Sequence, residues 1–191
     1  MQTGKVGIEI TPILDAHSLE PKFAAQLDAL LRRTCQLARA LTGAEQAALK
    51  LWVGEDSSQA RKYFSLSEKY AAFRDFRVDP KGYGLHAMTI PRGEVVRLTE
   101  AEVLSHPLYQ GFGALADAHP PIRGWLATSV WGDDGRVYGL LQLSDKSGGR
   151  DFDESDETNI HELSALIGET LDARCGWSPS GRLEPGGSPD S

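Results

Sequence analysis

The sequence predicts an α+β fold in which an antiparallel sheet of about five to six strands is covered on one face by two long helices. Two observations support this prediction: apolar residues recur every three or four positions near both ends, and alternating segments joined by turns lie between them. Strands joined by hairpins pair antiparallel, and amphipathic helices bury their apolar side against a sheet. Loops and short helices are then expected on the other face. A doubly wound fold is excluded, because strands and helices do not alternate.

The first long helix is predicted to begin near Glu20 and to end at Gly43. Pro21 suits a first helical turn, and glycine is favoured just after a helix end. Charged and polar residues occupy one face of this segment, so the helix is amphipathic. Its apolar positions, at helical spacing, are Phe23, Leu27, Leu30, Leu31, Thr34, Ala38 and Leu41.

A first hairpin is predicted after this helix. Residues 46–53 alternate well enough for a strand, a polar turn follows at 54–58, and residues 61–67 alternate again as the partner strand.

The middle of the chain is less regular. Residues 68–91 form an irregular aromatic segment, and residues 95–98 are a short strand. Thr99 and Glu102 have the spacing of a capping box, which predicts a short helix directly after that strand. The connection over residues 106–123 is long and rich in Gly, Pro and His, and long loops inside compact domains are often functional.

The last third of the sequence predicts a second hairpin and a second long helix. Residues 124–131 and 137–144 are the strands, and the turn lies at 132–135. Asp153 is the expected N-cap of the helix, which ends at Cys175. The apolar face of this helix is formed by Ile160, Leu163, Leu166, Ile167 and Leu171.

Length and charge narrow the class of protein. The chain has 191 residues, and 20 Lys and Arg against 27 Asp and Glu give a net charge of -7. Negative charge argues against binding of nucleic acid or an anionic membrane surface. With no signal peptide and no membrane-spanning run, a cytoplasmic protein is expected. Residues 1–19 are interpreted as an arm, 20–175 as one domain, and 176–191 as a disordered tail rich in Gly, Pro and Ser.

One stretch identifies a family. The end of the second hairpin and the start of the last helix resemble the GAF domain, whose members often carry an Asn-Lys pair, then Phe, then Asp-Glu. The pattern is matched here by Lys146, Phe152, Asp156 and Glu157, while Asp145 replaces the Asn. Lys146 is expected to pair with Asp156 and to join sheet to helix, with Phe152 filling the gap beneath. The motif is therefore interpreted as structural.

A candidate ligand pocket is predicted where the sheet meets its overlying loops. Apolar walls with a few polar anchors are typical of small-molecule sites. Arg74 or Arg123 could bind a carboxylate or phosphate, although the alternative is that the aromatic residues fill the core and the arginines reach solvent. The candidate pocket residues are Tyr70, Phe73, Arg74, Tyr83, His86, Phe112, Arg123 and Trp125.

Metal binding and catalysis are not expected. His86, His106 and His119 are far apart and no cysteine or carboxylate joins them at ligand spacing. Cys35 falls near the apolar side of the first helix, and Cys175 ends the last one. Some GAF domains reduce free methionine sulfoxide with loop cysteines, so a thiol-dependent reductase is kept as a less favoured alternative.

The resemblance implies a non-catalytic sensory or regulatory module that binds an unknown small molecule and signals through its terminal helices as a homodimer. Its cofactors are unknown. A histidine kinase or a cyclase is a possible signalling partner, because the sequence contains no kinase, cyclase or DNA-binding segment. The alternative is a scaffold domain that binds a protein and no small molecule.

Overall fold

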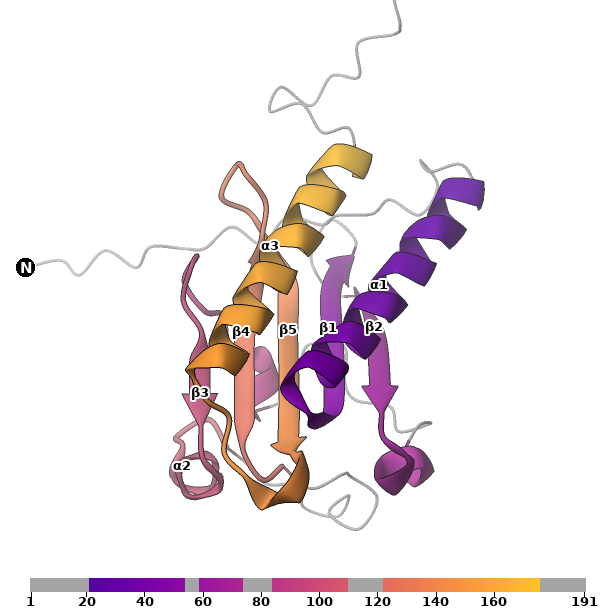
Figure 1. The fold of residues 1–191 in the computed structure, drawn as a ribbon. Helices are drawn as coiled ribbons and strands as arrows, with labels where there is room; N and C mark the ends of the chain where they lie inside the picture. The colour runs from indigo at the N-terminus through magenta and orange to yellow at the C-terminus, as the bar shows by residue number, and fades with distance from the viewer. Residues whose placement is uncertain (1–20, 54–58, 74–83, 110–121, 176–191) are drawn as a thin grey trace, which may run out of the picture.

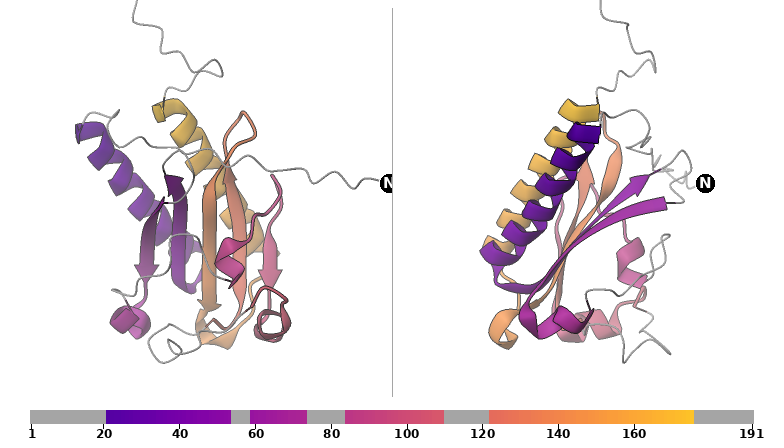
Figure 2. Two further views of the ribbon diagram at one scale, coloured as in Figure 1. Left: turned by 180° about the vertical axis from the view of Figure 1, so that it is seen from behind. Right: turned by 90° about the vertical axis from the view of Figure 1, so that its right-hand side faces the viewer.

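The computed structural model describes residues 21–53, 59–73, 84–109 and 122–175. Among these residues the chain forms one antiparallel sheet with the strand order β2-β1-β5-β4-β3. Two long helices, α1 and α3, lie side by side across one face of the sheet, and the short helical segments lie toward the other (Figures 1 and 2). The α+β fold predicted from the sequence is confirmed, with five strands in the described part.

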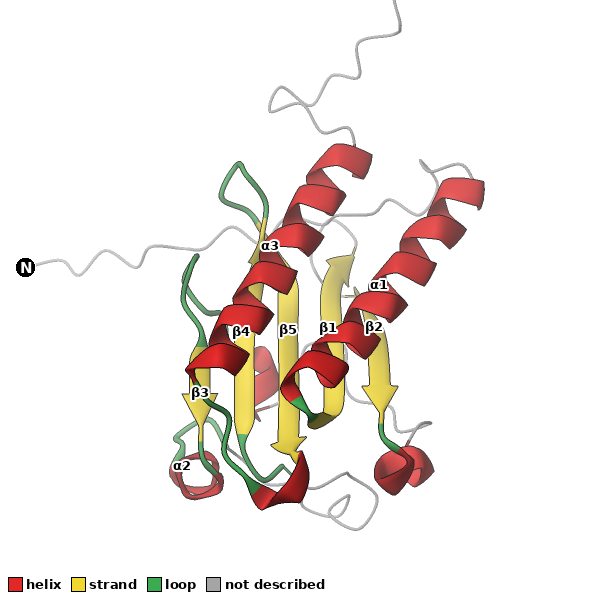
Figure 3. Cartoon of the chain, viewed as in Figure 1, coloured by secondary structure: helices red, strands yellow, loops and turns green. Residues whose placement is uncertain are grey.

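Most predicted elements are present within two residues of their expected ends (Figure 3). The strands are β1 (Ala44–Val53), β2 (Gln59–Leu66), β3 (Val96–Leu98), β4 (Trp125–Trp131) and β5 (Val137–Lys146). The α-helices are α1 (Pro21–Thr42), α2 (Glu100–Ser105) and α3 (Glu154–Cys175). The aromatic segment, which had no predicted structure, contains two short 3-10 helices, η1 (Glu68–Phe73) and η2 (Gly84–Ala87). A third, η4 (Ser147–Gly149), follows β5.

Local capping interactions set the helix ends as the sequence predicts. Gly43 follows α1 with a φ of 67°, a left-handed conformation that glycine adopts without strain. The Thr99 side chain and the Glu102 carboxylate form both hydrogen bonds of a capping box at the start of α2. At α3, Oδ1 of Asp153 accepts hydrogen bonds from the backbone N–H groups of Ser155 and Asp156 at 3.0 and 3.2 Å.

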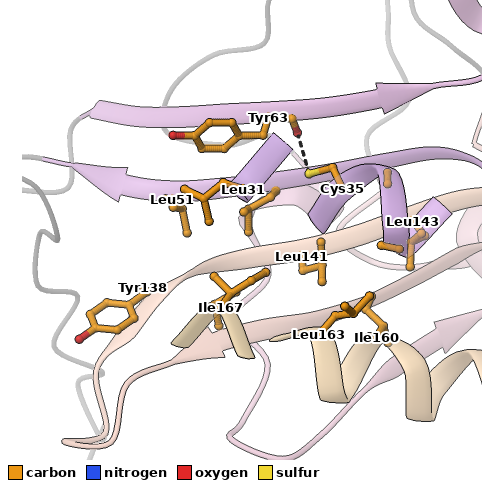
Figure 4. Packing of buried hydrophobic residues seen from close by; sticks show 14 of the residues in the cluster. Leu31, Cys35, Leu51, Tyr63, Tyr138, Leu141, Leu143, Ile160, Leu163 and Ile167 are labelled. Carbon is orange, nitrogen blue, oxygen red and sulfur yellow. Dashed lines mark hydrogen bonds between the residues drawn. The ribbon is translucent and has the colours of Figure 1, made fainter. Parts of the chain in front are cut away.

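The main hydrophobic core lies between the two helices and the sheet (Figure 4). Alternate residues of β1, such as Leu49 and Leu51, face the helices and are almost fully buried. A second, smaller cluster includes residues of β4, β5, η2 and α2, so the sheet is covered on both faces. Its members are Leu85, Ile90, Val103, Ile122, Trp125, Ala127 and Leu140.

Several leucines expected to be buried are instead exposed. Leu30 and Leu41 of α1 are 39% and 50% exposed, and Leu166 of α3 is 52% exposed. Leu37 of α1, which was not among the predicted apolar positions, is also 47% exposed. Helical spacing alone assigns these residues to an apolar side, but contact with the flat sheet buries only a narrower stripe of each helix. The outward sides of α1 and α3 therefore carry large apolar side chains.

An ion pair joins the end of the central strand to the start of α3. Nζ of Lys146 lies 2.5 Å from Oδ2 of Asp156 and 2.8 Å from Oδ2 of Asp153. Burial alone would lower the pKa of Lys146, but its hydrogen bonds to the two carboxylates raise that pKa above its ordinary value. Phe152 is 3% exposed and packs in the main core. The predicted pairing of Lys146 with Asp156 is confirmed.

Replacing Lys146 by methionine is expected to lower the free energy of unfolding by about 3–5 kcal/mol, because the change leaves the buried Asp156 carboxylate without its cation. Urea unfolding at neutral pH measures the loss. Lys69→Met, at an exposed lysine in η1, is the matched control and should change stability little. A double variant, Lys146→Met with Asp156→Leu, should recover part of the loss. Equal stabilities of Lys146→Met and wild type would contradict the assigned role.

Candidate functional site

A small hollow lies on the face of the sheet opposite α1 and α3. Strands β1, β2 and β5 form its floor, and the short helix η2 lies over one side (Figure 2). The space within it is about 30 Å³, enough for one or two water molecules. The residues that line it are Ala48, Leu49, Lys50, Lys62, Phe64, His86, Leu140 and Gln142.

Strand register explains why these residues meet. Lys50 of β1 pairs with Lys62 of β2 on one side and with Leu140 of β5 on the other. Ala48, two residues earlier, pairs with Phe64 and Gln142 in the same way. Because side chains alternate along a strand, these positions project together, away from the helix-facing residues of β1. The floor of the hollow is thus three adjacent strands: β1 contributes three lining residues, and β2 and β5 contribute two each.

The polar groups of the hollow include two lysines and a His–Gln contact. Nδ1 of His86 lies 2.8 Å from Oε1 of Gln142, a contact that holds η2 over β5. Lys50 is only 7% exposed, and its Nζ lies 3.8 Å from the centre of the Trp52 ring. This cation–π contact offsets part of the cost of burying the ammonium group. The surface of the hollow is therefore mainly apolar, with Lys50, Lys62, His86 and Gln142 among the residues that line it.

Four of the sequence-predicted site residues lie in three different places. His86 lines the hollow. Tyr70 and Phe73 belong to η1, where their ring centres are 6.1 Å apart and Tyr70 is 3% exposed. Trp125 is fully buried and packs in the second hydrophobic cluster, which is the core role that had been the alternative.

The other four candidate residues do not test the predicted pocket, which stays a prediction. Arg123 has an exposed side chain and contributes its backbone N–H to Asp145. Arg74, Tyr83 and Phe112 lie outside the described residues, as does His119. The proposal that all eight candidates share one cavity is therefore neither supported nor contradicted as a whole.

Sequence reasoning missed the two lysines of the hollow. A lysine within an alternating strand is ordinarily assigned to the solvent-facing side. The alternation of residues 46–53 and 61–67 alone therefore places Lys50 and Lys62 on that side. The available signal was the hairpin itself, because a turn centred near residue 56 places these two lysines opposite each other. That the face they share is covered by η2 depends on a contact from a distant part of the chain.

Asp145, directly before Lys146, connects several elements near the hollow. It has a left-handed φ of 59°, is 4% exposed, and accepts a 3.0 Å hydrogen bond from Nε2 of Gln46 in β1. It also accepts from the backbone N–H of Arg123, just before β4. Burial raises the pKa of Asp145, and the hydrogen bonds from Arg123 and Gln46 oppose that rise. Burial and then the charge of Asp145 raise the pKa of Tyr70 to about 12.

The described cysteine has no access to the hollow. Cys35 is fully buried in the main core, on the helix side of the sheet, and its Sγ lies 3.6 Å from the carbonyl oxygen of Tyr63 (Figure 4). Burial raises its pKa to about 12, so at neutral pH it is an unreactive thiol. The side chain of Cys175 is not described. Within the described residues, no three His, Cys, Asp or Glu side chains are grouped to hold a metal ion.

Comparison with known proteins agrees with this architecture. A family model described as GAF domain matches residues 24–172, so the chain belongs to the GAF domain family. The GAF domain of PixJ from Thermosynechococcus elongatus, in its blue-light absorbing form, is similar with a TM-score of 0.60 and 17% identity, covering 82% of this chain and 90% of that chain. In the part of the chain that is described, no helix has the length and apolar character needed to cross a membrane.

Two other solved structures are similar over comparable lengths. A GAF domain of a phosphoenolpyruvate-protein phosphotransferase from Coxiella burnetii has a TM-score of 0.58 and 19% identity, covering 78% of this chain and 86% of that chain. A type II free methionine-R-sulfoxide reductase from Thermoplasma acidophilum has a TM-score of 0.56 and 14% identity, covering 78% and 95%. At these identities the similarity establishes the fold alone, and this fold serves both sensory proteins and an enzyme.

Substitution of Asp145 by asparagine is expected to change how stability depends on pH. A raised pKa means that the folded protein binds this proton more tightly than the unfolded chain, so wild-type stability falls as pH rises above the ordinary value of 3.8. The stability of Asp145→Asn relative to wild type should therefore increase as the pH is raised from about 4, as measured by urea unfolding.

Asp151→Asn, at an exposed position six residues further along the chain, controls for the loss of one carboxylate. A stability difference between Asp145→Asn and wild type that stays constant with pH, or that runs in the opposite direction, would show that burial does not govern this group.

Proposed function

We propose that this protein is a non-catalytic sensory module that binds a small molecule in the hollow and transmits occupancy to its terminal helices. The observation that supports this best is that the hollow and the helices share strands. On β1, Lys50 lines the hollow while the next residue, Leu51, packs in the main core on the helix side. A ligand that alters the position of this strand therefore acts on both layers. Cys35, buried away from the hollow, supports a binding role over a thiol-dependent reductase.

Strand β5 offers a second connection. Gln142 lies in the hollow, and four residues later Lys146 is joined to Asp156 in the first turn of α3. Asp145 links the same strand end to β1 and to the start of β4. A ligand shifts a conformational equilibrium only if it binds one state more tightly. In this proposal, the two states differ in the position of β5 relative to α3.

The outward sides of α1 and α3 suit a homodimer. Leu30, Leu37 and Leu41 form an exposed apolar row along α1, and Leu166 is exposed on the neighbouring α3. Contiguous apolar surface of this kind commonly marks an interface. Charge favours one arrangement: α1 carries four basic residues and one acidic, whereas α3 carries six acidic residues and one arginine. We propose that α1 of one protomer packs against α3 of its partner, and that the pair signals to a partner protein such as a histidine kinase or a cyclase.

Ligand binding is tested by native mass spectrometry of freshly purified protein, with a thermal-shift screen of amino acids, organic acids, nucleotides and aromatic compounds. We expect a retained ligand or a stabilising compound. Ala48→Leu, which fills the hollow, should abolish the effect, whereas Ala101→Leu on the exposed side of α2 should not. Ligand-free wild-type protein with a flat screen would favour a scaffold role and contradict the sensory proposal.

Dimerisation is tested with Leu37→Arg. The change places a charge on a residue that is 47% exposed within the protomer, so the fold should tolerate it while the dimer dissociation constant rises more than about tenfold. Sedimentation equilibrium measures the constant. Leu104→Arg, at a leucine of α2 that is 59% exposed, is the matched control and should leave the dimer intact. Wild-type protein that remains monomeric at tens of micromolar would refute the proposed dimer.

A further inference from the structure

We propose that residues 6–12 of this chain add a further strand to the sheet, pairing antiparallel with the outer edge of β2. The proposal is independent of any ligand in the hollow. Among the described residues, β2 pairs with β1 alone, so its other edge has no strand beside it there. An open edge of eight residues is a template for another extended segment, and proteins usually cover such an edge.

An open groove lies between this edge and the first half of α1. Its volume is about 410 Å³. The residues that line it are Ala24, Ala25, Asp28 and Arg32 of α1 and Arg61, Lys62 and Tyr63 of β2. The three residues of β2 are consecutive and so project to both faces of the sheet. A groove that touches all three wraps around the edge of the strand, which is where an added strand would lie.

The chain that precedes α1 reaches the groove from the correct direction. The two elements run the same way, because Asp28 contacts Tyr63 near the start of both and Arg39 contacts Ser65 further along both (Figure 1). A segment that precedes α1 and turns back along β2 is therefore antiparallel to β2. The eight residues 13–20 span up to about 26 Å when extended, which is ample for this turn.

The sequence of the segment suits an edge strand. Val6, Ile8 and Ile10 alternate with small or polar residues, so one face of the segment is apolar. Branched side chains of this kind are favoured in strands. Pro12 lacks a backbone N–H and would end the ladder, so the pairing is limited to the residues before it.

An exposed aromatic ring on β2 selects the register in which Ile8 lies opposite Phe64. Phe64 is 44% exposed and lies on the face of the sheet opposite α1. An aliphatic residue directly across from it on an added strand covers part of this ring. Val6 and Ile10 then lie on the same face, on either side of Ile8. The apolar side of the segment is thus matched to the apolar side of the edge.

Charge complementarity favours the same register. Nη2 of Arg32 and Nη1 of Arg61 lie 3.4 and 3.6 Å from the carboxylate of Asp28, which also accepts a 2.7 Å hydrogen bond from Tyr63. One carboxylate thus serves two guanidinium groups, and Arg32 also lies over the ring of Tyr63. With Ile8 opposite Phe64, Glu9 lies opposite Tyr63 and brings a second carboxylate to the two arginines. Because both arginines are partly exposed, this contact fixes the register more than it adds stability.

The register is tested by disulfide formation in the full chain, in a Cys175→Ser background. Residues opposite each other on antiparallel strands have Cα atoms about 4.5–5.5 Å apart, which suits a disulfide. Ile8→Cys combined with Phe64→Cys should therefore give an intrachain disulfide under mild oxidation, detected by peptide mass spectrometry. Gly7→Cys combined with Phe64→Cys is the matched control and should react at least about tenfold more slowly, because residue 7 projects to the other face. Equal rates for the two pairs would overturn the proposal.

Hydrogen exchange gives a second measurement that needs no cysteine. Ile8→Asp, which places a charge against Phe64, should speed amide exchange in β2 at least about tenfold and leave exchange in β5 unchanged. Ile13→Asp, beyond the proposed strand, is the matched control and should exchange as the wild type does. Exchange in β2 that is the same for Ile8→Asp and the wild type would contradict the added strand.

A second copy of the chain is the alternative occupant of this edge. In that case Phe64→Cys alone would form a disulfide between two chains, and the pair of substitutions at Ile8 and Phe64 would give no intrachain link. Cross-links found only between chains would therefore overturn the proposal in favour of pairing between two copies of β2.

Discussion

The rest of the structure depends on how the end of β5 is held. Asp145 and Lys146 are consecutive, and their side chains are bound by different parts of the molecule: Asp145 by β1 and the start of β4, Lys146 by the first turn of α3. The left-handed backbone of Asp145 makes this divergence possible, and aspartate is one of the few residues besides glycine that tolerates it. These two adjacent residues thus connect the sheet to α3.

The sheet has two different buried faces, and that difference places the site. The helix side is filled mainly by apolar side chains. The other side is covered by short helices and loops, and a hydrophobic cluster at β4 gives way to charged and polar groups at β1, β2 and β5. The hollow therefore lies where β1, β2 and β5 meet, on the face of the sheet opposite α1 and α3.

Some contacts could be predicted from the sequence and others could not. The joint between Lys146 and Asp156 is predictable because the two residues are ten apart, at a strand end and a helix start. The capping box at Thr99 is predictable for the same reason of proximity. His86 was found as a candidate, but its partner Gln142 was not, because 56 residues separate them and neither has a local signal. Lys50 and Lys62 were missed because alternation does not tell which face of a strand is covered.

The sequence by itself determined the elements, their order, the antiparallel pairing and the family, because spacing, turns and caps act over a few residues. Only the tertiary structure decided which apolar residues remain exposed, as with Leu37, and which charged residues become buried, as with Lys50. Burial depends on what packs against a face, and here the packing elements come from distant parts of the chain. For this protein, the evidence for function therefore comes from residues whose burial or exposure is set by tertiary packing.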